Sequence, residues 1–174
     1  LQSLKIIKNS NCKIINLNDF EKNIIKKFNL EIQTLKSNLE KMWNLNSSFE
    51  EIFSYNSNTF WHSIKESFTK TCTSRFCESV RHILLVNELF DTLDISVILE
   101  WAELGQEEKE VLQLAKQNQI QTISLQHAMF PTSKIWNPFS RFVLTYNYPL
   151  ESTFQAIWGK SSEQHILKLG FNKN

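Results

Sequence analysis

The chain has 174 residues, of which 41% are hydrophobic and 21% are charged, a balance typical of a folded globular domain and unlike that of a disordered chain. Its formal net charge of +1 predicts no general attraction to nucleic acid or to anionic lipid. The apolar runs are only a few residues long, far short of the roughly 20 residues of a membrane span, so we expect no transmembrane helix.

The first half of the sequence lacks both helix-breaking residue types, because every glycine and every proline lies after residue 94. This predicts a mainly helical region over residues 1–93, with two short stretches, 5–7 and 13–15, that fit strands at its start. Capping boxes at residues 18–21 and 47–50 predict helix starts. Apolar side chains then recur at helical spacing, first from Ile24 to Met42 and again from Phe60 to about Leu93.

The second half changes to alternating strand and helix patterns. Residues 95–99 form a short apolar run typical of a strand buried on both faces. A helix is predicted over 106–118 and a further one over 161–169, with more strands expected at 120–125, 142–146 and 154–158. A strand–helix–strand unit of this length predicts parallel strands joined by a right-handed crossover. The expected fold class is therefore α/β, with a Rossmann-like parallel sheet over residues 94–174 preceded by the helical region.

Polar and aromatic residues follow three of the predicted strands, where ligands bind in open parallel sheets. The first strand is followed by Glu100 and Glu103, the second by Gln126 and His127, and the last by residues 158–160. A carboxylate near an imidazole can raise its pKa and hold its tautomer, which suits a general base or a phosphate contact. The alternative is a structural histidine that caps the loop after its strand.

The cysteines and the other histidines carry no recognisable motif. Cys12, Cys72 and Cys77 form no CxxC pair and no zinc-type cluster, so we expect free thiols, as in a reducing cytoplasm. We expect no metal site and no cofactor. The histidines on predicted helices have no partner motif in the sequence and should be surface or half-buried side chains, namely His62, His82 and His165.

Two segments together carry a family resemblance. They read VILEWAELGQEEKEVLQLAKQNQIQTISLQHAMFP and FQAIWGKSSEQHILKLGF. In order and spacing they resemble the N-terminal half of GT-B-type glycosyltransferases and related surface-carbohydrate (capsule polysaccharide) biosynthesis proteins. In that family a strand ends in an acidic residue, a helix and a second strand lead to LQHG, and a later WG precedes a helix that ends in LG.

The resemblance implies transfer of a sugar, or of a polyol phosphate, from a nucleotide-activated donor to a surface glycan, without a bound metal. It implies catalytic roles for His127, Glu100 and Glu103. It implies substrate-binding roles for five further residues: Gln126, Ala128, Trp158, Gly159 and Lys160. The expected partners are a nucleotide-sugar donor and a glycan or lipid-linked acceptor, with no nucleic acid. We expect a cytoplasmic protein at the inner face of the membrane, with peripheral membrane contact and oligomeric state left open.

Two departures from the family pattern keep other functions open. Ala128 stands where the family has a glycine, and a second Rossmann domain lies outside this sequence, so we expect a fragment of a two-domain enzyme. One alternative is an enzyme similar to nucleotide-sugar 2-epimerases, which share the architecture. The other is a non-catalytic α/β module for binding or assembly.

Overall fold

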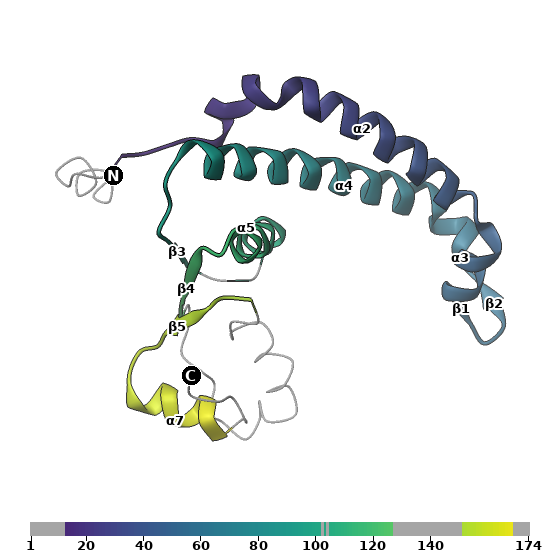
Figure 1. The fold of residues 1–174 in the computed structure, drawn as a ribbon. Coiled ribbons are helices and arrows are strands. Elements are labelled where there is room, and N and C mark those ends of the chain that lie inside the picture. Colours follow the sequence, from purple (N-terminus) through teal and green to yellow (C-terminus); the bar gives the residue numbers. More distant parts are fainter. Residues whose placement is uncertain (1–12, 102, 104, 127–150, 169–174) are drawn as a thin grey trace, which may run out of the picture.

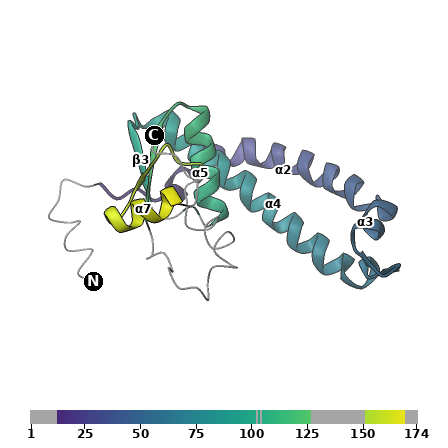
Figure 2. The same cartoon turned by 90° about the horizontal axis from the view of Figure 1, so that it is seen from below.

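The computed structural model describes residues 13–101, 103, 105–126 and 151–168. A hairpin of two long helices, α2 (Glu21–Trp43) and α4 (Trp61–Thr92), extends away from a small parallel sheet, as Figures 1 and 2 both show. Helix α5 (Gln106–Gln117) packs against the sheet end of α4 and joins the two parts. The expected boundary between residues 93 and 94 falls in the connection between α4 and the first strand of the sheet.

The two long helices pack along the apolar stripe that the sequence predicts. Ile24 of α2 and Leu84 and Leu85 of α4 are buried together, with Phe28 and Val80 against them. Because these side chains recur every three or four residues, one face of each helix is buried in the seam. Ile25 lies off this seam, at 44% exposed.

The start of the helical region differs from the expectation. Residues 13–15 form no strand, and Ile14 is 65% exposed, while residues 5–7 lie outside the described part. The short 3-10 helix η1 (Leu17–Phe20) precedes α2, and the Asn16 side chain accepts the backbone N–H of Asn18 at 3.0 Å. The polar cap therefore lies two residues before the predicted capping box, because η1 adds a turn ahead of α2.

The far end of the hairpin is held by aromatic packing. Here α3 (Asn46–Ile52) and the two-stranded ribbon of β1 (Ser54–Tyr55) and β2 (Asn58–Thr59) connect α2 to α4. Trp61 is 0% exposed and stacks on Phe49 and Phe53, with ring centroids 4.6 and 5.3 Å away. The predicted capping box at 47–50 is wrong: α3 begins at Asn46, so Ser47 lies inside it, and its N-cap makes no side-chain hydrogen bond.

The sheet confirms the predicted mixed α/β class with parallel strands. Its order is β3 (Val97–Glu100), β4 (Gln121–Leu125), β5 (Phe154–Ala156), and both pairings are parallel. Helix α5 connects β3 to β4, and α7 (Lys160–Lys168) follows β5. These elements match the predicted ones within a few residues; the strand expected at 142–146 lies outside the described residues.

One face of the sheet is more exposed than expected. The register places Val97 and Leu99 on the same face as Ile123 and Phe154, since paired residues of parallel strands point the same way. Val97 is 49% exposed, Leu99 62% and Phe154 48%. The prediction that the first strand is buried on both faces is therefore wrong. No helix among the described residues shields these side chains from solvent.

Within the described ranges, no helix combines the length and the apolar character that crossing a membrane requires.

Candidate functional site

Two segments of the resemblance meet where β4 and β5 end. The backbone N–H of Gln126 donates to the carbonyl of Ala156 at 2.9 Å, and the Gln126 side-chain Oε1 accepts the backbone N–H of Trp158, also at 2.9 Å. Gln126 is only 2% exposed. The glutamine of LQH and the tryptophan of WG are therefore joined by one hydrogen bond at the carboxyl edge of the sheet, where ligands of parallel sheets bind.

The turn after β5 depends on its glycine. Gly159 has φ of +115°, a conformation that residues with a Cβ rarely adopt, and α7 begins directly after it at Lys160. The side chains on either side of this turn point outward: Trp158 is 64% exposed and Lys160 is exposed. Strand β5 therefore ends in a turn that presents an aromatic and a cationic side chain to solvent.

Glu103 lies in a different place from the one its sequence position suggests. It is 9% exposed, and its carboxylate accepts the backbone N–H groups of Glu151 and Ser152 at 3.2 and 3.1 Å. Those residues lead into β5, whereas Glu103 follows β3, and β4 lies between the two strands. Glu103 thus links the connection after β3 to the segment that enters β5, and each of its two oxygens accepts one of these N–H groups.

Glu100 is a half-buried carboxyl group whose pKa is raised by its surroundings. It ends β3 beside Ser124 of β4, and its Oε2 atom is buried with no hydrogen-bond partner among the described residues. Burial, and then the negative charges of Glu108 and Glu103, raise the pKa of Glu100 from 4.5 to about 7. A carboxyl with this pKa can take up or release a proton near neutral pH, as a general acid or base must.

The residues predicted for the site are thus distributed over several interactions. The side chain of Gln126 is hydrogen-bonded to the backbone of Trp158. The carboxylates of Glu100 and Glu103 are close enough to interact electrostatically, and Glu103 binds backbone N–H groups on the other side of β4. His127 and Ala128 lie outside the described residues.

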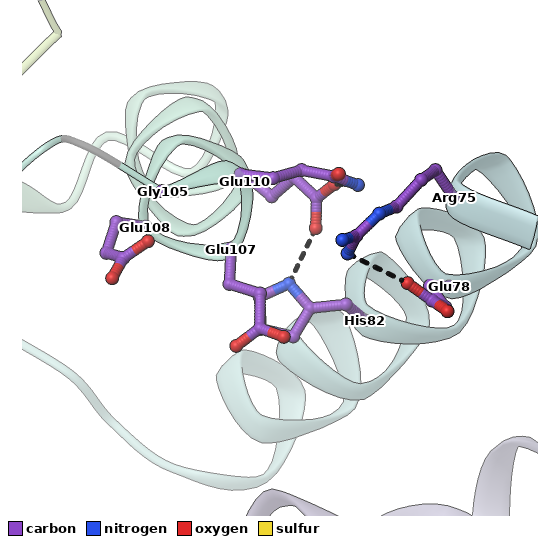
Figure 3. A pocket seen from close by; sticks show the side chains of 8 residues that line it. Arg75, Glu78, His82, Gly105, Glu107, Glu108 and Glu110 are labelled. Atoms are coloured by element: carbon purple, nitrogen blue, oxygen red, sulfur yellow. Dashed lines mark hydrogen bonds and ion pairs between the residues drawn. The ribbon is translucent and has the colours of Figure 1, made fainter. Parts of the chain in front are cut away.

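A second polar cluster between α4 and α5 was not anticipated from the sequence. The buried carboxylate of Glu110 accepts from the hydroxyl of Ser79 and from the side-chain amide of Gln106 at 2.8 Å. It also lies 2.7 Å from Nδ1 of His82, which carries the proton, since a carboxylate can only accept. Figure 3 shows this pair pointing toward each other. Both side chains line a cavity of about 230 Å³, whose lining also includes Arg75.

His82 is half-buried, as the sequence predicts, but the sequence did not indicate which residue it pairs with. Its side chain is 14% exposed and is paired with Glu110 of the neighbouring helix. A signal was present in the sequence, because Glu110 lies one helical turn before the buried Leu114, on the inward face of α5. A charged side chain on a buried helix face needs a hydrogen-bonding or charged partner. Only the packing of α4 on α5 shows that the partner of Glu110 is His82.

Metal-ligand geometry does not occur in the part of the chain that the structure describes: no three His, Cys, Asp or Glu side chains are grouped there so as to hold an ion. Cys72 and Cys77 are free thiols, and Cys12 lies outside the described residues.

Comparisons with known proteins give no relative: no protein-family model matches the chain, and no curated protein or solved structure is significantly similar to it.

Proposed function

We propose that this chain is the Rossmann-like, acceptor-side part of a GT-B-like glycosyltransferase. The reaction is transfer of a sugar, or of a polyol phosphate, from a nucleotide-activated donor to a surface glycan or a lipid-linked acceptor. The observation that carries the proposal is the hydrogen bond between Gln126 and the backbone of Trp158 at the carboxyl edge of parallel strands. It supports treating the LQH and WG segments as parts of one site, as the resemblance implies.

The proposed roles follow from the environment of each residue. Glu100, with its pKa near neutrality, exchanges a proton at the site, and His127 serves as the base or as a phosphate contact. Trp158, Gly159 and Lys160 form a turn at the hinge side of the cleft that contacts the donor, while most donor contacts come from the second Rossmann domain that the resemblance implies. Glu103 is better suited to holding backbone than to proton transfer, because its oxygens already accept two N–H groups.

Calorimetric titration with nucleotide-linked sugars tests this proposal. UDP-, CDP- and GDP-linked donors are titrated into the wild-type full-length protein and into the His127→Ala and Glu100→Gln variants, and turnover is measured with the donor that binds. We expect binding of one donor class, with turnover reduced about 10²- to 10⁴-fold in His127→Ala, the usual contribution of a general base. His62→Ala is the control, since His62 is paired with Glu50 at the far end of the hairpin. A folded wild-type protein that binds none of these donors contradicts the proposal.

The helical hairpin favours a second candidate, a non-catalytic binding or assembly module. It extends away from the sheet (Figures 1 and 2), and its end exposes large apolar side chains: Leu45 at 56%, Ile52 at 70% and Tyr55 at 73%. Such side chains suit contact with another protein or with the membrane surface at which a cytoplasmic glycosyltransferase meets a lipid-linked acceptor. Retained partner or vesicle binding without any donor binding would select this function.

A further inference from the structure

The side chain of Gln126 completes the pairing between β4 and β5. The last residue pair in register is Leu125 with Ala156, and the Gln126 N–H still donates to the Ala156 carbonyl. Two residues later the N–H of Trp158 has moved off the ladder, and Oε1 of Gln126 accepts it instead of a backbone carbonyl. A side chain therefore continues the strand pairing at the point where β5 becomes a turn.

This contact gives the backbone N–H of Trp158 a hydrogen-bond partner at the end of β5. The left-handed backbone of Gly159 redirects the chain into α7, and the N–H of Trp158, one residue earlier, donates to the Gln126 side chain and not to the β4 backbone. A polar group that loses water without gaining a partner is costly to the folded state. The Oε1 atom of Gln126 gives the N–H of Trp158 such a partner, from a residue that is itself 2% exposed and held by the ladder.

The opposite end of β5 is held in an analogous way by a different residue. Glu103 accepts the N–H groups of Glu151 and Ser152, just before β5 begins. Strand β5 has only three residues, 154–156, so few ladder hydrogen bonds fix it. Gln126 holds the outgoing end and Glu103 the incoming end, which makes each residue a matched control for the other.

We propose that Gln126 is a positioning residue that holds the Trp158–Gly159–Lys160 turn in its donor-binding conformation before the donor arrives. The role of the turn in donor binding rests on the proposed function; the holding of the turn does not. A turn that is already ordered pays less conformational entropy on binding, so the contact strengthens donor affinity without touching the donor.

Amide hydrogen exchange at single residues, followed by NMR, tests the holding of the turn. Gln126→Met keeps the length of the side chain and removes the acceptor, while Gln126→Glu keeps an acceptor oxygen. We expect the Trp158 amide to exchange at least about tenfold faster in Gln126→Met and to return toward the wild-type rate in Gln126→Glu. Glu103→Met should instead accelerate exchange at Glu151 and Ser152 and leave Trp158 within about twofold.

Two results overturn the holding role. One is an unchanged Trp158 exchange rate in Gln126→Met. The other is equal acceleration in Gln126→Met and Gln126→Glu, which would mean that packing, not the acceptor oxygen, orders the turn. If Gln126→Met does not fold, Gln126→Asn takes its place, because its amide is one methylene too short to reach Trp158.

Donor affinity of the same variants, in the full-length protein, tests the consequence for function. We expect Gln126→Met to raise the Kd and KM for the donor about tenfold with kcat within about twofold, and Gln126→Glu to restore both. If the Trp158 amide exchanges faster in Gln126→Met but the donor affinity is unchanged, the positioning role is overturned. If the wild-type protein binds no donor, the proposed function fails, while the exchange experiment still decides whether Gln126 holds the turn.

Discussion

The helical hairpin and the sheet region are stabilised in different ways. In the hairpin, apolar side chains meet along one stripe of each helix, and at its far end the fully buried Trp61 stacks on Phe49 and Phe53. In the sheet region and where α5 meets α4, buried polar side chains contact backbone or one another, as Gln126, Glu103 and Glu110 do. Apolar packing is non-directional and tolerates small changes, whereas each buried polar group depends on one partner at one distance. The sheet region should therefore be the more sensitive to pH and to isosteric substitution.

The largest expected effect is the loss of the aromatic cluster at the end of the hairpin. Trp61→Ala should destabilise the protein by about 3–5 kcal/mol, because it removes a side chain that is 0% exposed and stacks on two phenylalanines. Chemical denaturation followed by circular dichroism measures the change. Tyr55→Ala, at a residue that is 73% exposed on the same end, should change stability by less than about 0.5 kcal/mol. Equal effects of the two variants would refute the assignment of Trp61 to a packed core.

The second largest effect is expected for the polar cluster around Glu110, where α5 of the sheet region packs on α4 of the hairpin. Glu110→Leu should destabilise the protein by about 2–4 kcal/mol, since the donors of Ser79, His82 and Gln106 lose their common acceptor. A double-mutant cycle with His82→Leu isolates the pair and should give a coupling of about 1 kcal/mol or more. Lys109→Ala, an exposed neighbour on α5, serves as the control. Additive effects of the two leucine variants would show that the pair does not couple α4 to α5.

The sheet region should also respond to pH through Glu100. Its pKa is raised in the folded state, so the folded protein binds more protons than the unfolded chain between pH 4.5 and about 7, and stability falls as pH rises through that window. Glu100→Gln should stabilise the protein by roughly 1–2 kcal/mol at pH 8, allowing for solvent around this half-buried group. The gain should vanish near pH 4. Denaturation at both pH values measures it, with Glu107→Gln as the control; a gain of equal size at both would exclude a raised pKa.

The smallest effect is expected for the polar edge of the hairpin. Arg81 donates to Glu21 through two nitrogens, at 3.1 and 3.0 Å, but both side chains remain a third or more exposed. Arg81→Met should therefore cost only about 0.2–1 kcal/mol, and added salt should reduce that cost. Thermal denaturation at low and high ionic strength measures both. A loss above about 2 kcal/mol would show that ion pairing, and not the apolar seam, holds the two helices together.

The hairpin was largely predictable because its signal is local. The stripe from Ile24 to Met42 repeats at helical spacing and matches α2, and the absence of glycine and proline matches the uninterrupted length of α4. The errors lay at the ends, at residues 13–15 and at the two capping boxes. Helix ends depend on which side chain reaches a free N–H, and that choice belongs to the three-dimensional arrangement, as Asn16 illustrates.

The sequence by itself determined the α/β class and the places where β3, α5, β4, β5 and α7 begin within a few residues, because each depends on the periodicity of its own side chains. The resemblance also placed Gln126 and Trp158 among the candidate site residues. Only the tertiary structure decided that these two are bonded to each other, that Glu103 reaches across β4, and that His82 meets Glu110. These contacts join residues about 30 to 50 positions apart, so their partners are chosen by packing and by the need to satisfy buried polar groups, which no local pattern encodes.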